Sequence, residues 1–244
     1  MKAEGPPRMV LSVGGSIIDR QSGTGPITFN TPFLGEFASL LKECSRLPDS
    51  AAFVVCGGGL LARAAITLAI SQGVTNDDAL DRLAIEQTRV NAREVAARLV
   101  EADVDAKYVR SRRDMSKCKK NHRVWVTAGD GPGHTTDFVA VKIAEEQQIG
   151  VVINLSKTSF LFWPCQDGTP DLSRPIKNMT WQRFFEIFDT LKYSPGLNFP
   201  VDPVAAKAAM SAKIDFVCLN GEELGNLKYY LDTGRIRGTH LKAV

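Results

Sequence analysis

Short apolar runs alternate with segments of helical spacing along almost the whole chain. The runs contain few polar positions, as is typical of strands buried on both faces of a sheet; they span residues 9–13, 51–56, 124–127, 150–155 and 216–219. Apolar residues three and four positions apart predict helices over residues 31–47, 60–72, 78–102, 137–147, 181–191, 203–211 and 222–230. This alternation predicts an α/β fold, with a mainly parallel sheet and helices on both of its faces.

The remaining segments predict connections and short edge strands. Residues 21–30 are rich in Gly, Pro, Ser and Thr and predict a loop, whereas residues 164–178 predict a loop or a hairpin. Short strands are expected at 107–109 and 238–242. No internal repeat or low-complexity linker interrupts the chain, so we expect one domain over 1–244, with a soft division near residue 150 into lobes 1–150 and 151–244.

Composition excludes several functional classes. The 244 residues include 30 basic and 27 acidic side chains, and the resulting net charge of +3 is too small to favour nucleic acid or membrane partners. No apolar run reaches the roughly 20 residues of a membrane span. The 5 cysteines are scattered, as in a reduced cytoplasmic protein, and the 3 histidines argue against a histidine-rich metal site. The basic stretch at 110–120 predicts a solvated loop, with a phosphate-facing loop as the alternative.

Three glycine-rich junctions follow predicted strands: Gly14-Gly15-Ser16, Gly57-Gly58-Gly59 and Gly131-Pro132-Gly133. Glycine has no Cβ, so the backbone can turn tightly and approach a ligand closely. Free amides in such turns, and the partial positive charge at the start of a following helix, favour anions such as phosphates. The first junction alone is weak, because an ordinary strand-to-helix turn explains it equally well.

The second and third junctions are followed by polar and charged side chains that suit ligand binding. Arg63 follows the second glycine run by four residues, so its guanidinium can return to a phosphate held there; the alternative is an ordinary surface cation. After the third junction, His134, Thr135, Thr136 and Asp137 crowd into a helix start. Helix capping explains one of these residues but not easily all four. For His134, phosphate contact and helix capping are both open.

The junctions occur in an order that resembles the amino acid kinase superfamily. The resemblance is carried by GGS at 14–16, GGGLLAR at 57–63, DRLAIEQTRVNA at 81–92, GPGHTTD at 131–137 and DPVAAK at 202–207, and it continues to Gly238-Thr239. Within the superfamily the chain is most similar to uridylate kinases of the archaeal type. Isopentenyl phosphate kinases of the same superfamily usually carry a histidine after the second glycine turn, where this chain has Leu60-Leu61-Ala62-Arg63.

The resemblance implies a three-layer αβα sandwich, ATP and Mg²⁺ as cofactors, UMP as acceptor and a hexameric homo-oligomer. It implies roles for matching residues: Gly57, Gly58 and Arg63 on the UMP phosphate, Asp81 on its ribose, Thr135 and Thr136 across the UMP, Gly14, Gly15 and Ser16 on the ATP phosphates, and Asp202 at the reacting centre and perhaps at magnesium. Phosphoryl transfer suits such a site, because it requires mainly two aligned phosphates and neutralised charge.

Two departures from the family pattern concern the donor side. Ser12 stands where many relatives have a lysine, and residues 154–160 read NLSKTSF where relatives typically read TNVDGVY. Lys157 therefore replaces an acidic residue, while Phe160 retains a ring that can stack on a base. In one interpretation Lys157 reaches the ATP phosphates and replaces the missing lysine. In the other, ATP binding has decayed.

Three functions follow from these observations. The first is a UMP kinase. The second is a non-catalytic module that binds or stores a nucleotide or oxyanion, and the altered donor segment favours it. The third is a kinase for another small acceptor, although Arg63 and Asp81 favour one that is phosphorylated and hydroxylated.

Overall fold

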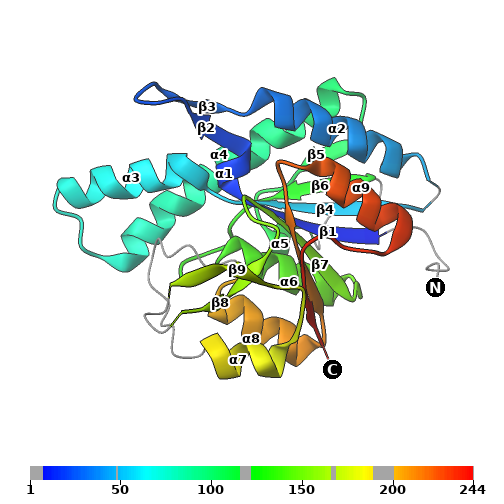
Figure 1. Cartoon of the computed structure of the whole chain (residues 1–244). Coiled ribbons are helices and arrows are strands. Elements are labelled where there is room, and N and C mark those ends of the chain that lie inside the picture. Colours follow the sequence, from blue (N-terminus) through cyan, green and yellow to red (C-terminus); the bar gives the residue numbers. More distant parts are fainter. Residues whose placement is uncertain (1–7, 48, 116–121, 166–168, 189–200, 244) are drawn as a thin grey trace.

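The computed structural model describes residues 8–47, 49–115, 122–165, 169–188 and 201–243. In these ranges, the main sheet has eight strands in the order β10-β12-β11-β7-β1-β4-β6-β5 (Figure 1). They are β1 (Arg8–Val13), β4 (Ala51–Cys56), β5 (Ala106–Tyr108), β6 (Val124–Thr127), β7 (Val151–Ser156), β10 (Asn178–Thr180), β11 (Asp215–Asn220) and β12 (Thr239–Lys242). All neighbouring pairs are parallel except β11 and β12. The predicted, mainly parallel sheet is confirmed.

Helices cover both faces of the sheet, so the expected three-layer αβα sandwich is confirmed. One face packs against α2 (Thr31–Ser45), α4 (Asp77–Glu101) and α9 (Leu224–Thr233), and the other against α6 (Thr136–Glu146), α7 (Trp181–Phe188) and α8 (Pro203–Ala212). Successive strand residues point to opposite faces; in β1, Leu11 and Val13 join the first core, whereas Val10 joins the second.

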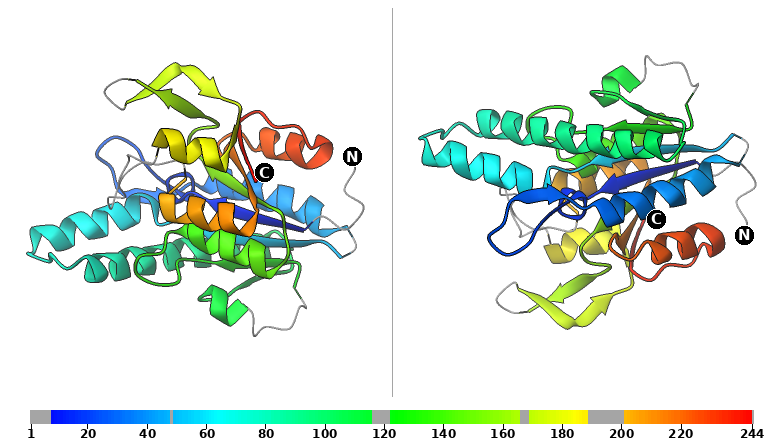
Figure 2. Two further views of the ribbon diagram at one scale, coloured as in Figure 1. Left: turned by 90° about the horizontal axis from the view of Figure 1, so that it is seen from below. Right: turned by 90° about the horizontal axis from the view of Figure 1, so that it is seen from above.

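The remaining helices lie near the ends of the central strands. They are α1 (Gly15–Ile18), α3 (Gly59–Ser71) and α5 (Arg112–Met115). Helix α3 and the first part of α4 project from the body as a helical hairpin, which is clear from two directions (Figures 1 and 2). No helix in the described ranges has both the length and the apolar character needed to cross a membrane.

Polar side chains define where several helices begin. Asn76 accepts a hydrogen bond from the amide of Ala79 at the start of α4, and Thr135 caps α6 in the same way. At α8, Asp202 accepts from two amides and Pro203 follows it, a combination that favours a helix start. These caps place the starts of α6 and α8 close to the sheet edge where the glycine junctions lie.

One sequence-based prediction needs correction, and two others have outcomes to report. The loop predicted over 21–30 was wrong, because β2 (Asp19–Gln21) and β3 (Ile27–Phe29) form an antiparallel hairpin there. At 164–178 the hairpin alternative is confirmed by β8 (Leu161–Pro164) and β9 (Pro170–Ile176). The helix predicted over 181–191 is described only to Phe188, and its last three residues lie outside the described ranges.

Candidate active site

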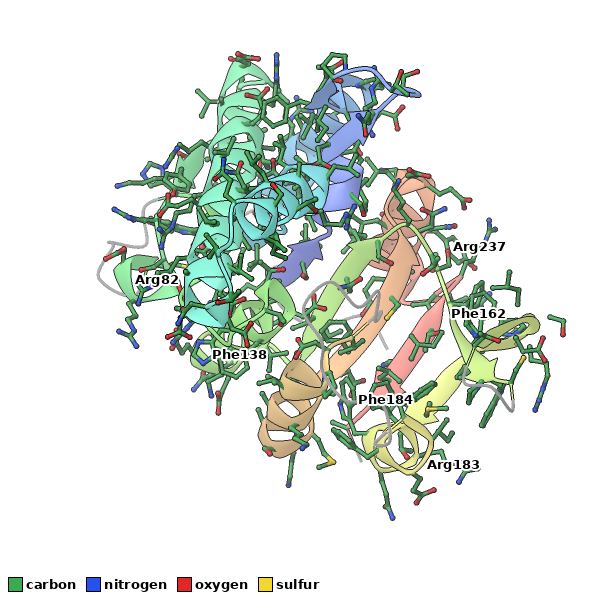
Figure 3. The ribbon with its side chains drawn as sticks, turned by 90° about the vertical axis from the view of Figure 1, so that its left-hand side faces the viewer. Arg82, Phe138, Phe162, Arg183, Phe184 and Arg237 are labelled. Carbon is green, nitrogen blue, oxygen red and sulfur yellow. The ribbon has the colours of Figure 1, made fainter. Side chains whose placement is uncertain are left out.

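The three glycine junctions meet at one edge of the sheet. They follow β1, β4 and β6, which are adjacent and parallel, so their carboxyl ends lie together. Figure 3 looks onto this edge, with Arg82 and Phe138 on one side of the view and Phe162 and Arg237 on the other. Ligands of open parallel sheets bind in this position, outside the carboxyl ends of the strands.

The first and second glycine turns are in direct backbone contact. A Cβ added to Gly15 would lie 2.0 Å from the amide nitrogen of Gly59 and 2.6 Å from the carbonyl oxygen of Gly57. A Cβ added to Gly57 would lie 2.7 Å from the nitrogen of Gly15. Glycine at these positions is therefore required by the close approach of two main chains.

Some amides of these turns are already used, and others are free. The amide of Gly14 donates to the carbonyl of Leu155 at 2.8 Å, and that of Gly57 donates to the carbonyl of Val13 at 2.8 Å. Gly14 and Gly57 therefore line the turns without offering a free amide. By contrast, no described group accepts from the amides at four positions of the two turns: Gly15, Ser16, Gly58 and Gly59. These four N–H groups are the donors that the turns can offer to an anion.

Helix α4 connects the second and third junctions. The side-chain amide of Asn91 donates to the carbonyl of Gly57 at 2.8 Å, and the Thr88 hydroxyl accepts from the amide of Gly129 at 3.0 Å. Near the outer end of α4, Asp81 accepts from the amide of Gly133 at 2.8 Å. The structure thus brings Asp81 to the third junction, and its contact with a ribose stays a prediction.

Cationic and aromatic side chains flank the turns. Arg63 lies on the first turns of α3, is exposed and makes no ion pair within the described part of the chain. His134 stacks on Phe138, with 4.4 Å between ring centroids, and the cap of α6 is Thr135. The capping alternative for His134 is therefore wrong. Arg112, from the basic stretch, pairs with Asp130, whereas residues 116–121 of that stretch lie outside the described ranges.

A half-buried carboxyl group, that of Asp137, lies behind the junctions. Asp137 Oδ1 accepts from the Ser12 hydroxyl at 2.6 Å and from the Asn154 side-chain amide at 2.9 Å. Ser12 and Asn154 are partners in register on β1 and β7, so two adjacent strands hold the same oxygen. In the sequence, the one signal for Asp137 is its place among the four polar residues that crowd the helix start after the third junction.

The pKa of the Asp137 carboxyl is raised to about 7, mainly because the group is desolvated by burial. The hydrogen bonds from Ser12 and Asn154 oppose this rise, and the carboxylate of Asp202 adds to it. The folded chain therefore holds this proton more tightly than the unfolded chain does. Consequently, the contribution of Asp137 to the free energy of unfolding decreases as the pH rises from 3.8 to about 7.

We predict that Asp137→Asn removes this part of the pH dependence. The amide keeps a carbonyl acceptor for Ser12 and Asn154 and cannot ionise, so the variant should gain stability relative to the parent chain at pH 8 but not at pH 4. Urea denaturation at both pH values measures this, with the exposed Asp232→Asn as control. Equal pH dependence in the parent chain and Asp137→Asn would contradict the prediction.

Asp202 and Thr135 join the starts of two helices. Asp202 Oδ1 accepts from the amides of Val204 and Ala205 at 2.8 and 3.0 Å, and its Oδ2 accepts from the Thr135 hydroxyl. Both carboxylate oxygens thus accept hydrogen bonds within the protein, and the contact of Asp202 with magnesium stays a prediction. Thr136 is half-buried at the first position of α6, beside this contact.

The altered donor segment leaves the sheet next to the first junction. Lys157 follows β7, is exposed and makes no ion pair in the described ranges. The preceding Cα, of Ser156, lies 3.8 Å from where a Cβ on Gly14 would be. Ser159 holds the segment in place, since its hydroxyl accepts from the amide of Asn220 at 3.1 Å. Phe160 is half-buried. Lys157 thus lies close to the first turn.

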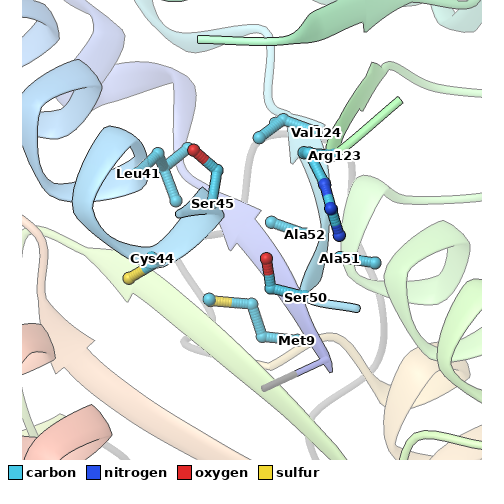
Figure 4. Close-up of a pocket in the computed structure, with 9 residues that line it drawn as sticks. All are labelled: Met9, Leu41, Cys44, Ser45, Ser50, Ala51, Ala52, Arg123 and Val124. Atoms are coloured by element: carbon cyan, nitrogen blue, oxygen red, sulfur yellow. The ribbon is translucent and has the colours of Figure 1, made fainter. Parts of the chain in front are cut away.

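Two other polar side chains do not contribute to this site: Ser50 lies away from this edge, and Cys56 is unreactive. A pocket between α2 and the starts of β1 and β4 contains the buried Ser50 hydroxyl, which has no hydrogen-bond partner among the described residues (Figure 4). It lies at the opposite end of the strands from the glycine junctions. Cys56 precedes the second junction, but burial raises the pKa of its thiol, which favours an inert packing role.

Free amides on glycine turns, at the carboxyl edge of a parallel three-layer sheet, define a phosphate-binding α/β protein. The chain belongs to the amino acid kinase family, whose model matches residues 7–220. It is 28% identical over 235 residues to a uridylate kinase of Methanothrix thermoacetophila, covering 96% of this chain and 99% of that protein. A uridylate kinase of Thermoplasma volcanium is 33% identical over 238 residues, with 92% of each chain covered.

Solved structures agree with this assignment. The crystal structure of uridylate kinase from Archaeoglobus fulgidus matches with a TM-score of 0.73 and 28% identity, over 96% of this chain and 99% of that one. The structure of UMP kinase from Bacillus anthracis has a TM-score of 0.75 at 17% identity, over 97% and 96% of the two chains, and supports the fold alone. The predicted resemblance is confirmed.

Proposed function

We propose that this chain is a uridylate kinase, which transfers the γ-phosphoryl group of ATP to UMP. An oxygen of the UMP phosphate attacks the γ-phosphorus, the bond from that phosphorus to the β–γ bridging oxygen breaks, and UDP and ADP form. The observation that carries the proposal is the contact between two glycine turns with free amides, at the start of the helix that contains Arg63. The relatives favour this function over storage of an oxyanion, because they are named as uridylate kinases.

In this proposal the protein acts by holding charge rather than by covalent chemistry. Gly58, Gly59 and Arg63 bind the UMP phosphate, and the amides of Gly15 and Ser16 bind the phosphates of ATP. Gly14 allows the first turn to lie against the end of β7, and Gly57 allows the two turns to approach each other. The acceptor is already an anionic phosphate, so no general base is required. Asp202 positions the starts of α6 and α8 through Thr135, which places Asp137 behind the reacting groups.

Further predicted contacts concern the two nucleosides. Asp81, His134, Thr135 and Thr136 face UMP, and Phe160 stacks on the adenine, in a division between an acceptor lobe at 1–150 and a donor lobe at 151–244. The described residues contain no group of three or more His, Cys, Asp or Glu placed to hold a metal. Magnesium would then be held mainly by nucleotide phosphates, as is usual for this ion, and we assign it no protein ligand.

A coupled assay tests the proposed activity directly. Purified chain with UMP, ATP and Mg²⁺ should form UDP and ADP in equal amounts, and uridine should not replace UMP, because it offers no phosphate to the second turn. Saturable nucleotide binding without any turnover would instead support the non-catalytic alternative.

We further propose that Lys157, which directly follows β7, neutralises the negative charge of the ATP phosphates. In this role it replaces the lysine that many relatives have at the position of Ser12. Lys157→Ala should raise the KM for ATP about tenfold and leave the KM for UMP unchanged, because one exposed charge contact to the donor is lost. Lys213→Ala is the control, since Lys213 follows α8 outside the site. Steady-state kinetics with each nucleotide varied in turn measures both constants, and an equal rise in both would argue against a donor role.

We also propose a homo-oligomer, a hexamer by family resemblance, that uses the projecting α3–α4 hairpin. Three apolar residues of this hairpin are exposed: Leu68 (58%), Ile70 (54%) and Leu83 (38%). A second copy that packs its own hairpin against this one would cover apolar side chains of this kind. Light scattering should give a mass well above 26.6 kDa, and Leu68→Lys with Ile70→Lys should reduce it. The control, Leu172→Lys on β9, should not, and a monomeric parent chain would refute the interface.

A further inference from the structure

A buried acidic side chain occupies the start of α3. Asp19 is 0% exposed, and its two oxygens accept separately from the amides of Leu60 and Leu61, each at 3.0 Å. These amides belong to the first turn of α3, where helix amides lack partners within the helix. An acceptor-only carboxylate satisfies both of them and complements the positive end of the helix.

The neighbouring backbone is shaped around this carboxylate. Gly59 has a φ of +62°, and a Cβ added there would lie 2.4 and 2.5 Å from the two Asp19 oxygens. The chain before Asp19 is held by Asn30, whose side-chain amide donates to the carbonyl of Ile17 at 3.0 Å and whose backbone amide donates to that of Ile18 at 2.8 Å. Asp19 and the start of α3, which it contacts, are therefore both held in place.

This arrangement decides which donors remain for a bound phosphate. A helix start that follows a glycine turn would normally offer its own amides to an anion, but at α3 those of Leu60 and Leu61 are taken. The free amides next to them belong to Gly58 and Gly59, and Arg63 has no ion pair in the described ranges. Gly59 in turn lies against Gly15 of the first turn.

We infer that Asp19 is a positioning residue that excludes the acceptor phosphate from the start of α3 and confines it to Gly58, Gly59 and Arg63. Confinement there keeps the acceptor beside the first turn, where the proposed donor phosphates bind. The inference rests on the proposed function for the identity of the acceptor. Position matters because phosphoryl transfer depends on aligned reacting groups, and small misplacements slow it strongly.

Asp19→Ala should strengthen UMP binding and slow turnover. The variant frees two helix amides and removes a negative charge beside the site, so we expect UMP to bind up to about tenfold more tightly. The phosphate would then lie deeper on α3, and kcat should fall at least about tenfold because the reacting groups are no longer aligned. Calorimetric titration of UMP and the coupled assay measure the two quantities, with the exposed Asp232→Ala as control.

Asp19→Asn provides a second variant should the alanine variant not fold. It keeps one carbonyl acceptor and removes the charge, so a smaller gain in UMP affinity and a smaller loss of kcat are expected. A folded variant with both constants within twofold of the parent chain would refute the inference. So would weaker binding together with slower turnover, since that pattern indicates structural support alone.

Inorganic phosphate serves as a probe that does not depend on UMP. If the parent chain forms no UDP, the proposed function fails, yet Asp19→Ala should still bind phosphate more tightly than the parent chain does. Unchanged or weaker phosphate binding by the folded variant would overturn the role of Asp19, whatever the activity.

Discussion

Replacing Gly15 by alanine is expected to destabilise the protein by about 3 kcal/mol and to abolish UDP formation. The added methyl group would lie 2.0 Å from the nitrogen of Gly59 and 2.6 Å from both the oxygen of Gly57 and the carbonyl carbon of Gly58. All three atoms are backbone atoms, so no side chain can rotate away. The turns must separate, and the amides that they present would no longer converge.

Gly35→Ala is a matched control for this variant. Gly35 lies within α2, and nothing lies within 4 Å of a Cβ added there. This substitution should be neutral or stabilising by about 0.5–1 kcal/mol, because alanine favours a helix. Urea denaturation and the coupled assay report on both variants. Parental stability and turnover in Gly15→Ala would show that the turns do not meet as described.

Arg63→Ala is expected to lower kcat/KM for UMP about a hundredfold, which corresponds to about 2.7 kcal/mol. The loss follows from removing a charge-assisted bond to the acceptor phosphate. Arg63 is exposed and makes no ion pair within the described residues, so the melting temperature should stay the same. A decrease in activity without a decrease in stability therefore identifies a binding role.

The control for Arg63 is Arg46→Ala, an exposed arginine at the end of α2, near the opposite edge of the sheet. Steady-state kinetics with UMP varied should leave this control at the parental value. If Arg63→Ala and Arg46→Ala behave alike, Arg63 is a surface cation and the acceptor phosphate binds elsewhere.

The parts of the fold that depend on local pattern were predictable. Buried strands and amphipathic helices follow from hydrophobic spacing, and glycine junctions after three strands predicted a common site because parallel strands end together. The β2–β3 hairpin was missed because residues 21–30 lack an alternating pattern. Its short strands are defined by pairing with each other rather than by burial.

Features that depend on distant contacts could not be predicted. Asp19 belongs to no motif in the sequence, and its role emerges only when α1 brings it to the start of α3. The use of the Gly14 and Gly57 amides within the sheet, and the hydrogen bonds of Asp137 with Ser12 on β1 and Asn154 on β7, also require the packed structure. In each case the sequence contains the residue but not the partner that defines its chemistry.

Helix α4 is hydrogen-bonded to both the second and the third glycine junction. Asn91 and Thr88 contact these junctions near the sheet, and Asp81 contacts the third junction about two to three helical turns further out. A helix moves as a rigid body, so a displacement of its outer end shifts both junctions together. A partner that displaces the exposed part of α4 near Leu83 would therefore move these two junctions and alter turnover, although no residue that contacts a nucleotide is changed.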